Sequence, residues 1–126
     1  PVRERILLAG PADDVTLASL YSEAAVFSLP SHLEGFGLPV LEAMLLGCPV
    51  VVSDSSSLPE VVGEAGLVAR TGDAVSLGEA IARVLTEPGC AEALAEAGRQ
   101  RAGLFTWEKT ADLTLAVYEE AAESRR

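Results

Sequence analysis

Short continuous apolar runs, separated by segments with helical spacing, are the feature of this sequence that most limits its fold. Four such runs are expected to form strands: residues 5–10, 25–29, 49–53 and 67–69. A run without polar alternation is typical of a strand that is buried on both faces of a parallel sheet. The order strand, helix, strand, helix, strand therefore predicts an α/β fold with a parallel sheet flanked by helices.

Capping residues indicate where the helices between these strands begin and end. Asp13 or Asp14 can cap the first helix. The second helix is expected over residues 38–46, because Pro39 favours a helix start and Gly47 favours a helix end. Two helices thus fill the first two connections between strands.

The carboxyl-terminal half has a different character. After Asp73 the chain is rich in Ala, Glu, Leu and Arg, which predicts a helical half, with Thr106 as the N-cap of its last helix. Packing roles on apolar helix faces are expected for these side chains: Leu77, Ile81, Val84, Leu85, Trp107 and Tyr118. No linker or repeat divides the chain, so a single domain is expected over residues 1–126.

Composition and charge exclude several classes of partner. The formal net charge is −10, and binding to a phosphate backbone depends on Lys and Arg, so we expect no nucleic-acid partner. We find no apolar run long enough for a transmembrane segment and no signal peptide, which favours a cytoplasmic protein. Cys48 and Cys90 lack the spacing of metal ligands and are expected to be buried thiols.

Residues 34–42 form the most informative stretch, because Glu34 and Glu42 lie on either side of a glycine-rich turn. Gly35 and Gly37 allow positive φ and a close approach of the backbone to a ligand. The amides of such a turn point outward at the start of a helix, where phosphate or sugar oxygens bind. The turn also follows the carboxyl end of a strand, the edge where parallel α/β folds bind ligands. With Glu42 in the first helical turn, its carboxylate can accept hydrogen bonds from the diol of a ribose.

These residues resemble the E-x7-E motif of the large family-4 group of retaining glycosyltransferases with the GT-B fold. Further segments resemble the donor-domain pattern of that family, so nearly the whole chain is covered: residues 29–31, 42–44, 47–51, 58–62 and 105–108. The resemblance implies a truncated half of a GT-B fold. This half would be a Rossmann-like nucleotide-sugar-binding domain that lacks its upstream first βα units and the acceptor-binding amino-terminal domain.

The resemblance also implies the reaction, in which a sugar passes from a nucleotide diphosphate sugar to an acceptor with retention at the anomeric carbon. Glu34 would be the catalytic carboxylate near the transferred sugar. The implied donor-binding residues are Gly35, Phe36, Gly37, Leu38 and Glu42. No cofactor or metal is implied, because an upstream Arg and Lys usually neutralise the leaving diphosphate in such enzymes. This sequence starts after that region, so we expect weak donor binding and inactivity of the isolated chain.

Three further side chains are weaker candidates for the site: Ser31, His32 and Glu60. A lone loop histidine is more often an incidental polar residue than a proton carrier, and residues 57–60 are more typical of a turn that starts a short helix. Residues 54–57 follow a strand end and can either face the ligand or only form a turn, because Asp and Ser favour turns. Residues 55–60 resemble mannosyltransferases of the family, which implies guanosine diphosphate mannose as the donor.

Other functions remain open at this point. The chain could be a stand-alone nucleotide-binding or subunit-contact module without catalysis. A flavodoxin-like receiver is disfavoured, because its acidic pocket should lie at strand ends, whereas the first run ends in Gly10 and Pro11. A domain separated from its partner exposes apolar surface, so self-association of the fragment is expected. If the acceptor is linked to lipid, we expect a peripheral protein at the inner face of the membrane.

Overall fold

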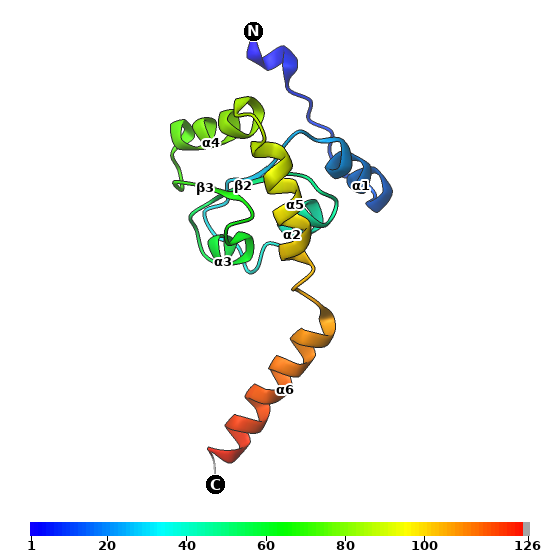
Figure 1. Cartoon of the computed structure of the whole chain (residues 1–126), viewed down its shortest axis with the longest axis vertical. Coiled ribbons are helices and arrows are strands. Elements are labelled where there is room, and N and C mark those ends of the chain that lie inside the picture. Colours follow the sequence, from blue (N-terminus) through cyan, green and yellow to red (C-terminus); the bar gives the residue numbers. More distant parts are fainter. Residues whose placement is uncertain (125–126) are drawn as a thin grey trace.

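The computed structural model describes residues 1–124 and contains a three-stranded parallel sheet with helices around it (Figure 1). The strands are β1 (Phe27–Leu29), β2 (Val50–Ser53) and β3 (Leu67–Ala69), hydrogen-bonded in the order β1-β2-β3. The helices, in chain order, are η1 (Val2–Arg5), α1 (Asp14–Glu23), α2 (Leu38–Leu45), α3 (Leu58–Val62), α4 (Ala74–Thr86), α5 (Cys90–Ala102) and α6 (Trp107–Glu123). The predicted Rossmann-like α/β architecture is confirmed.

Strand β2 lies in the centre of the sheet, and its side chains alternate between two apolar cores. Val51 packs into the core formed with α4 and the first part of α5, whereas Val50 and Val52 pack into the core formed with α1, α2 and α3. Successive side chains of a strand point to opposite faces, so a strand covered on both sides needs apolar residues throughout. The continuous apolar run of β2 therefore reflects burial on both faces, as predicted.

The helix starts predicted at Asp13 and Thr106 are also confirmed, and each has a side-chain cap. The carboxylate of Asp13 accepts a hydrogen bond of 2.8 Å from the amide of Thr16 at the start of α1. The hydroxyl of Thr106 accepts one of 3.1 Å from the amide of Lys109 at the start of α6. These bonds satisfy amides that have no partner within the helix.

The strand predicted over residues 5–10 is wrong. Within this stretch η1 ends at Arg5, away from the body, and the chain then runs to α1 as an irregular segment (Figure 1). The side chains of Leu7 and Leu8 are 87% and 91% exposed. A strand buried on both faces needs a neighbouring strand and two covering layers, and within residues 1–124 no strand pairs with this segment. Apolar character alone does not supply them.

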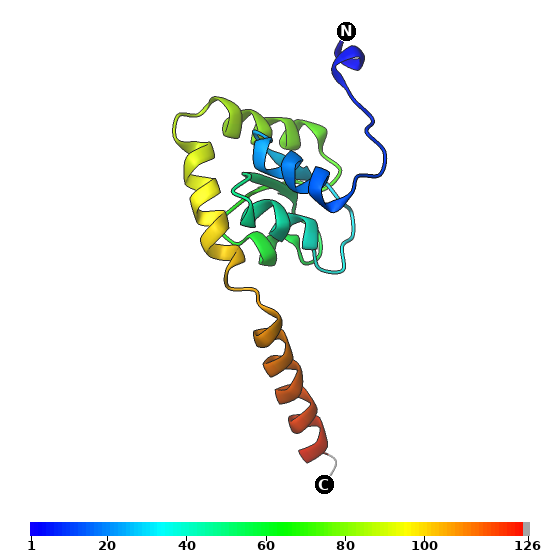
Figure 2. The same ribbon diagram turned by 90° about the vertical axis from the view of Figure 1, so that its right-hand side faces the viewer.

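The packing roles predicted for Trp107 and Tyr118 are wrong as well, because their side chains are 78% and 68% exposed. Helix α6 projects away from the body in both views, and none of its residues is buried (Figure 2). Leu85 is likewise exposed, and Cys90 is only half-buried, whereas Cys48 is buried as predicted. Among the described helices, α6 included, we find none with the length and apolar character needed to cross a bilayer.

Candidate functional site

The glycine-rich turn before α2 has the geometry expected of a ligand-binding helix start. Gly37 is the N-cap residue and adopts a left-handed conformation with φ of 104°. A Cβ at this position would lie 2.8 Å from Cδ2 of Leu58, so the turn needs glycine for both conformation and space. Gly35 does not share this requirement, because its φ is not positive and a Cβ added there would meet nothing within 4 Å.

Amides at this turn are available to a ligand. Within residues 1–124 the amides of Phe36, Gly37 and Leu38 have no hydrogen-bond acceptor, and Pro39 carries no N–H. Phe36 and Leu38 are 43% and 52% exposed, whereas Gly37 between them is buried, so the flanking residues of the turn lie at the surface. Unpaired amides at the start of an eight-residue helix form a favourable place for anionic or hydroxyl oxygens.

Two serines hold Glu34 in place, one at its carboxylate and one at its backbone amide. Its carboxylate accepts a hydrogen bond of 2.6 Å from the hydroxyl of Ser31. Its backbone amide donates one of 2.9 Å to the hydroxyl of Ser56, which comes from the loop after β2. The side chain is half-buried. Glu34 therefore has a fixed backbone position and one carboxylate oxygen that is already oriented.

Glu42 lies on the exposed side of α2, one turn further along than predicted. Helix α2 begins at Leu38, so Glu42 is its fifth residue and falls in the second turn, because a turn takes 3.6 residues. Its neighbour across the α1–α2 contact is Tyr21. Burial raises the pKa of the Tyr21 phenol, and the negative charge of Glu42 raises it further. Glu42 therefore faces the side of the molecule where α1 packs.

A serine segment, residues 53–57, supports the loop that carries Glu34. The hydroxyl of Ser53 donates a hydrogen bond of 2.5 Å to the carbonyl of Ser31. The hydroxyl of Ser55 donates one to the carbonyl of His32. The hydroxyl of Ser57 donates one of 2.8 Å to the carbonyl of Phe36. Strands β1 and β2 are parallel neighbours, so the loops at their carboxyl ends meet. The sequence left open whether residues 54–57 face a ligand or only form a turn. In the structure the hydroxyls of Ser55 and Ser57 form hydrogen bonds to the neighbouring loop.

Asp54, within the same segment, joins the loops after β2 and β3. Its carboxylate accepts hydrogen bonds of 2.6 Å from the hydroxyl and 2.8 Å from the amide of Thr71. The hydroxyl bond, followed by the amide bond, lowers the pKa of Asp54 below its ordinary value of 3.8. This contact fixes one loop against the next.

The lowered pKa of Asp54 predicts a pH dependence of stability. A carboxyl group with a lowered pKa in the folded state stabilises the fold above its unfolded pKa, and this contribution is lost as the pH falls through the folded value. Asp54→Ala is therefore expected to be less stable than the parent chain at pH 6, with the difference shrinking below about pH 4. Thermal unfolding of both proteins from pH 6 to pH 2 measures it. Asp112→Ala, an exposed change on α6, is the control; a difference that stays constant with pH would contradict the prediction.

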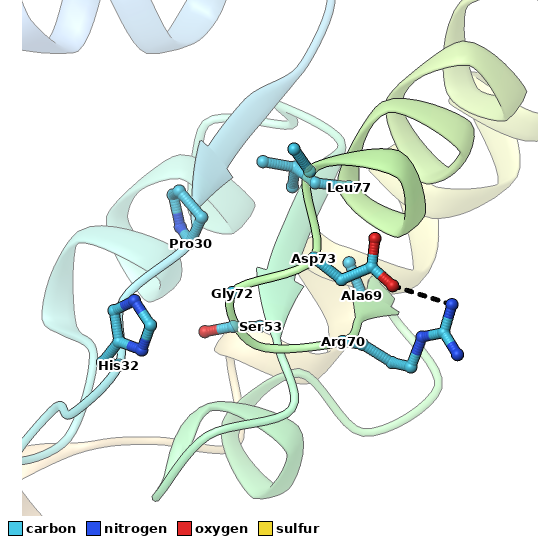
Figure 3. A pocket seen from close by; sticks show the side chains of 9 residues that line it. Pro30, His32, Ser53, Ala69, Arg70, Gly72, Asp73 and Leu77 are labelled. Carbon is cyan, nitrogen blue, oxygen red and sulfur yellow. Dashed lines mark ion pairs between the residues drawn. The ribbon is translucent and has the colours of Figure 1, made fainter.

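A hollow of about 230 Å³ lies beyond the carboxyl ends of all three strands (Figure 3). His32 and Pro30 line one side, and Ser53 from β2 lies between them and the turn that enters α4. On that turn Arg70 and Asp73 form an ion pair with 2.7 Å between Nη2 and Oδ2. Glu34 and Glu42 do not line this hollow. It is therefore a feature of the same sheet edge that is separate from the two carboxylates.

A longer groove of about 520 Å³ runs between α6 and the body, and Phe36 and Glu60 are among its lining residues. The three weaker candidates thus have different positions. Ser31 contacts Glu34, His32 lines the hollow of Figure 3, and Glu60 is exposed at the groove. Of these, only Ser31 contacts one of the two principal carboxylates.

The fold and the turn define a class of protein: a parallel α/β domain with unpaired amides at a helix start, at the carboxyl edge of its sheet. The sequence profile described as "Glycosyl transferases group 1" matches residues 1–101. The chain therefore belongs to the glycosyl transferases group 1 family. Its structure matches sucrose-phosphate synthase from Thermosynechococcus elongatus with a TM-score of 0.81 and 36% identity, over 96% of this chain and 31% of that one. The chain thus has the Rossmann-like architecture of part of a GT-B fold.

Several bacterial relatives are similar to this chain. The O-antigen chain mannosyltransferase B of Escherichia coli is 43% identical over 86% of this chain and 29% of its own length. The MMP alpha-(1->4)-mannosyltransferase of Mycolicibacterium hassiacum is 43% identical over 86% of this chain and 27% of its own. The glycogen synthase of Mycobacterium tuberculosis is 37% identical over 98% of this chain and 32% of its own. The chain spans less than a third of the length of each of these relatives.

Proposed function

We propose that this chain forms the donor-binding side of a retaining glycosyltransferase that transfers a hexosyl group from a nucleotide diphosphate sugar to an acceptor. The observation that carries the proposal is the turn at Gly37. Its neighbouring amides are unpaired and lie at the surface, with Glu34 before the turn and Glu42 after it in the chain. Membership of the glycosyl transferases group 1 family supports the same role.

Each part of the turn has a defined task in this proposal. The amides of Phe36, Gly37 and Leu38 donate hydrogen bonds to sugar and diphosphate oxygens. The carboxylate of Glu34, oriented by Ser31, lies near the anomeric carbon and stabilises the positive charge that develops there as the bond to the diphosphate breaks. The exposed carboxylate of Glu42 accepts hydrogen bonds from the ribose hydroxyls.

The charge on the leaving diphosphate needs more than this turn supplies. A helix start contributes about 0.3–1 kcal/mol to an exposed anion and up to about 2 kcal/mol to a partly buried one. Charge-assisted hydrogen bonds are about twice as strong as neutral ones. We therefore propose that cationic side chains upstream of this chain complete a site that works without a metal, and that the isolated chain is inactive.

Remaining parts of the proposal concern the whole protein. Because the chain spans less than a third of its relatives, the acceptor site and the second wall of the cleft are assigned to a preceding domain. Two relatives are named mannosyltransferases, which supports guanosine diphosphate mannose as the first donor to test. A lipid-linked acceptor would make the protein peripheral at the inner membrane face.

Two measurements test the proposal. Calorimetric titration of the isolated chain with GDP-mannose and UDP-glucose is expected to show dissociation constants no tighter than about 1 mM. The protein extended at its amino terminus to the length of its relatives is expected to bind one of these donors and to transfer the sugar in the presence of a chelator. Proton NMR of the product should show the anomeric configuration of the donor. Low-micromolar affinity of the isolated chain would contradict the need for upstream cations, and an extended protein that binds neither donor would contradict the function.

A subunit-contact module without catalysis is the alternative, and the exposed apolar side chains of α6 favour it. Leu113, Val117 and Tyr118 are each more than 60% exposed. Such a surface suits association with a partner or with a second copy of the chain. The extended protein separates the two functions, because a module of this kind would associate through α6 but would not transfer sugar.

A further inference from the structure

Arg101, at the end of α5, reaches across to α3. Its Nε donates a hydrogen bond of 3.0 Å to the carbonyl of Val61, and its Nη2 donates one of 2.6 Å to the carbonyl of Glu60. The last carbonyls of a helix have no partner within it, so the guanidinium satisfies two acceptors at the end of α3. Gly63 leaves room for it, since a Cβ there would lie 3.2 Å from the guanidinium carbon.

The same guanidinium lies against an aromatic pair that leads to the glycine turn. Its central carbon is 5.4 Å from the ring centroid of Phe105, a distance typical of a cation–π contact. The ring of Phe105 meets the ring of Phe36 edge to face, with 5.9 Å between the centroids. Phe36 is one of the residues whose amides we assign to the donor. Arg101 is thus two contacts away from the proposed site.

The other end of α3 is tied to the same residue. Ser57, the N-cap residue of α3, does not cap the helix with its side chain. Instead, its hydroxyl donates a hydrogen bond of 2.8 Å to the carbonyl of Phe36. The contacts therefore form a closed ring: Ser57, Phe36, Phe105, Arg101 and the end of α3 at Val61. The start of α3 holds the backbone of Phe36 through Ser57. The end of α3 holds the ring of Phe36 through Arg101 and Phe105.

We propose that Arg101 is a positioning residue for the donor site, a role that rests on the proposed function. By fixing Phe105 it holds the ring of Phe36, and so sets the direction of the unpaired amides of Phe36, Gly37 and Leu38. Within residues 1–124 Arg101 has no carboxylate partner at ion-pair distance. Its charge is directed to the carbonyls of α3 and to the aromatic ring, and the planar guanidinium can make both contacts at once.

The first test measures order in the turn and does not depend on catalysis. In the full chain, the amides of Phe36, Gly37 and Leu38 are expected to have NMR order parameters near 0.85, and Arg101→Met is expected to bring them below about 0.6. Arg101→Lys keeps the charge but cannot bond both carbonyls and lie flat on the ring, so it should restore only part of the order. Amides of β2 serve as the internal reference. Arg83→Met is the matched control, because Arg83 is exposed on α4 and pairs with Glu87.

Phe105→Leu keeps the proposal open to test if Arg101→Met does not fold. This change leaves both hydrogen bonds of Arg101 to α3 in place but removes the ring, so it should loosen the turn as Arg101→Met does. Combining the two changes should add little further loss, since both break the same ring of contacts. Unchanged order parameters at the turn in folded Phe105→Leu or Arg101→Met would overturn the proposal.

The second test uses the extended protein. Arg101→Met is expected to raise the KM for the donor about tenfold, with the KM for the acceptor unchanged, because only the donor contacts the turn. Arg101→Lys should recover part of the change, and Arg83→Met should equal the parent protein. The two failures are distinguishable: a parent protein that binds no donor rejects the proposed function, whereas normal donor KM in Arg101→Met rejects only the positioning role.

Discussion

Glu34→Gln is expected to lower kcat for sugar transfer by about 10²–10³-fold in the extended protein, the loss seen when one preorganised electrostatic partner of a transition state is removed. Glutamine keeps the size of the side chain and can still accept the hydrogen bond from Ser31, so the loop should keep its position. Only the negative charge opposite the developing positive charge is lost. Steady-state kinetics with saturating donor and acceptor measure the effect.

A matched control exists for this change. Glu64→Gln removes one negative charge at an exposed position after α3, and it should leave kcat within the error of the parent protein. Glu42→Gln should act differently from Glu34→Gln, with a larger effect on donor KM than on kcat, because the ribose contact is made in both the ground state and the transition state. Full activity in both Glu34→Gln and Glu42→Gln would end this assignment of the site.

Gly37→Ala is expected to destabilise the chain by about 2–5 kcal/mol, the sum of left-handed backbone strain and overpacking. The residue has φ of 104°, where a Cβ is disfavoured. The new methyl group would also lie 2.8 Å from Cδ2 of Leu58, a fully buried side chain, so one of the two must shift. Urea unfolding followed by circular dichroism measures the change in the free energy of unfolding.

Gly35→Ala is the control for this prediction, because it lies two residues earlier in the same turn. Its φ is not positive, and no atom lies within 4 Å of the added Cβ. A change of less than about 0.5 kcal/mol is expected, as for most surface substitutions. If both alanine variants were equally stable, the turn would not depend on the conformation of Gly37.

Much of the fold follows from local patterns in the sequence. The apolar runs that became β1, β2 and β3 and the caps at Asp13 and Thr106 were predictable, because side-chain alternation and capping depend on residues close together in the chain. The turn at Gly37 was predictable for the same reason. The roles of Glu34 and Glu42 remain predictions that the kinetic experiments above address.

The errors about burial share one origin, which is that burial depends on neighbours that are distant in sequence. Residues 5–10 have the composition of a strand but no strand beside them among the described residues. Trp107 and Tyr118 have the spacing of a packed stripe, but α6 lies away from the body. The one-turn error at Glu42 is different: the helix start at residue 38 was predicted correctly, but the fifth residue of a helix with 3.6 residues per turn lies in the second turn.

The sequence by itself determined the parallel α/β class, the glycine turn and the family resemblance, since each depends on short-range spacing and residue type. Only the tertiary structure decided what holds the turn in place. Ser57 reaches Phe36 across 21 positions of the chain, and Arg101 reaches Val61 across 40. Such contacts exist because parallel strands bring their carboxyl-end loops to one edge and because α5 ends beside α3. Neither arrangement can be predicted from the residue spacing within a single segment.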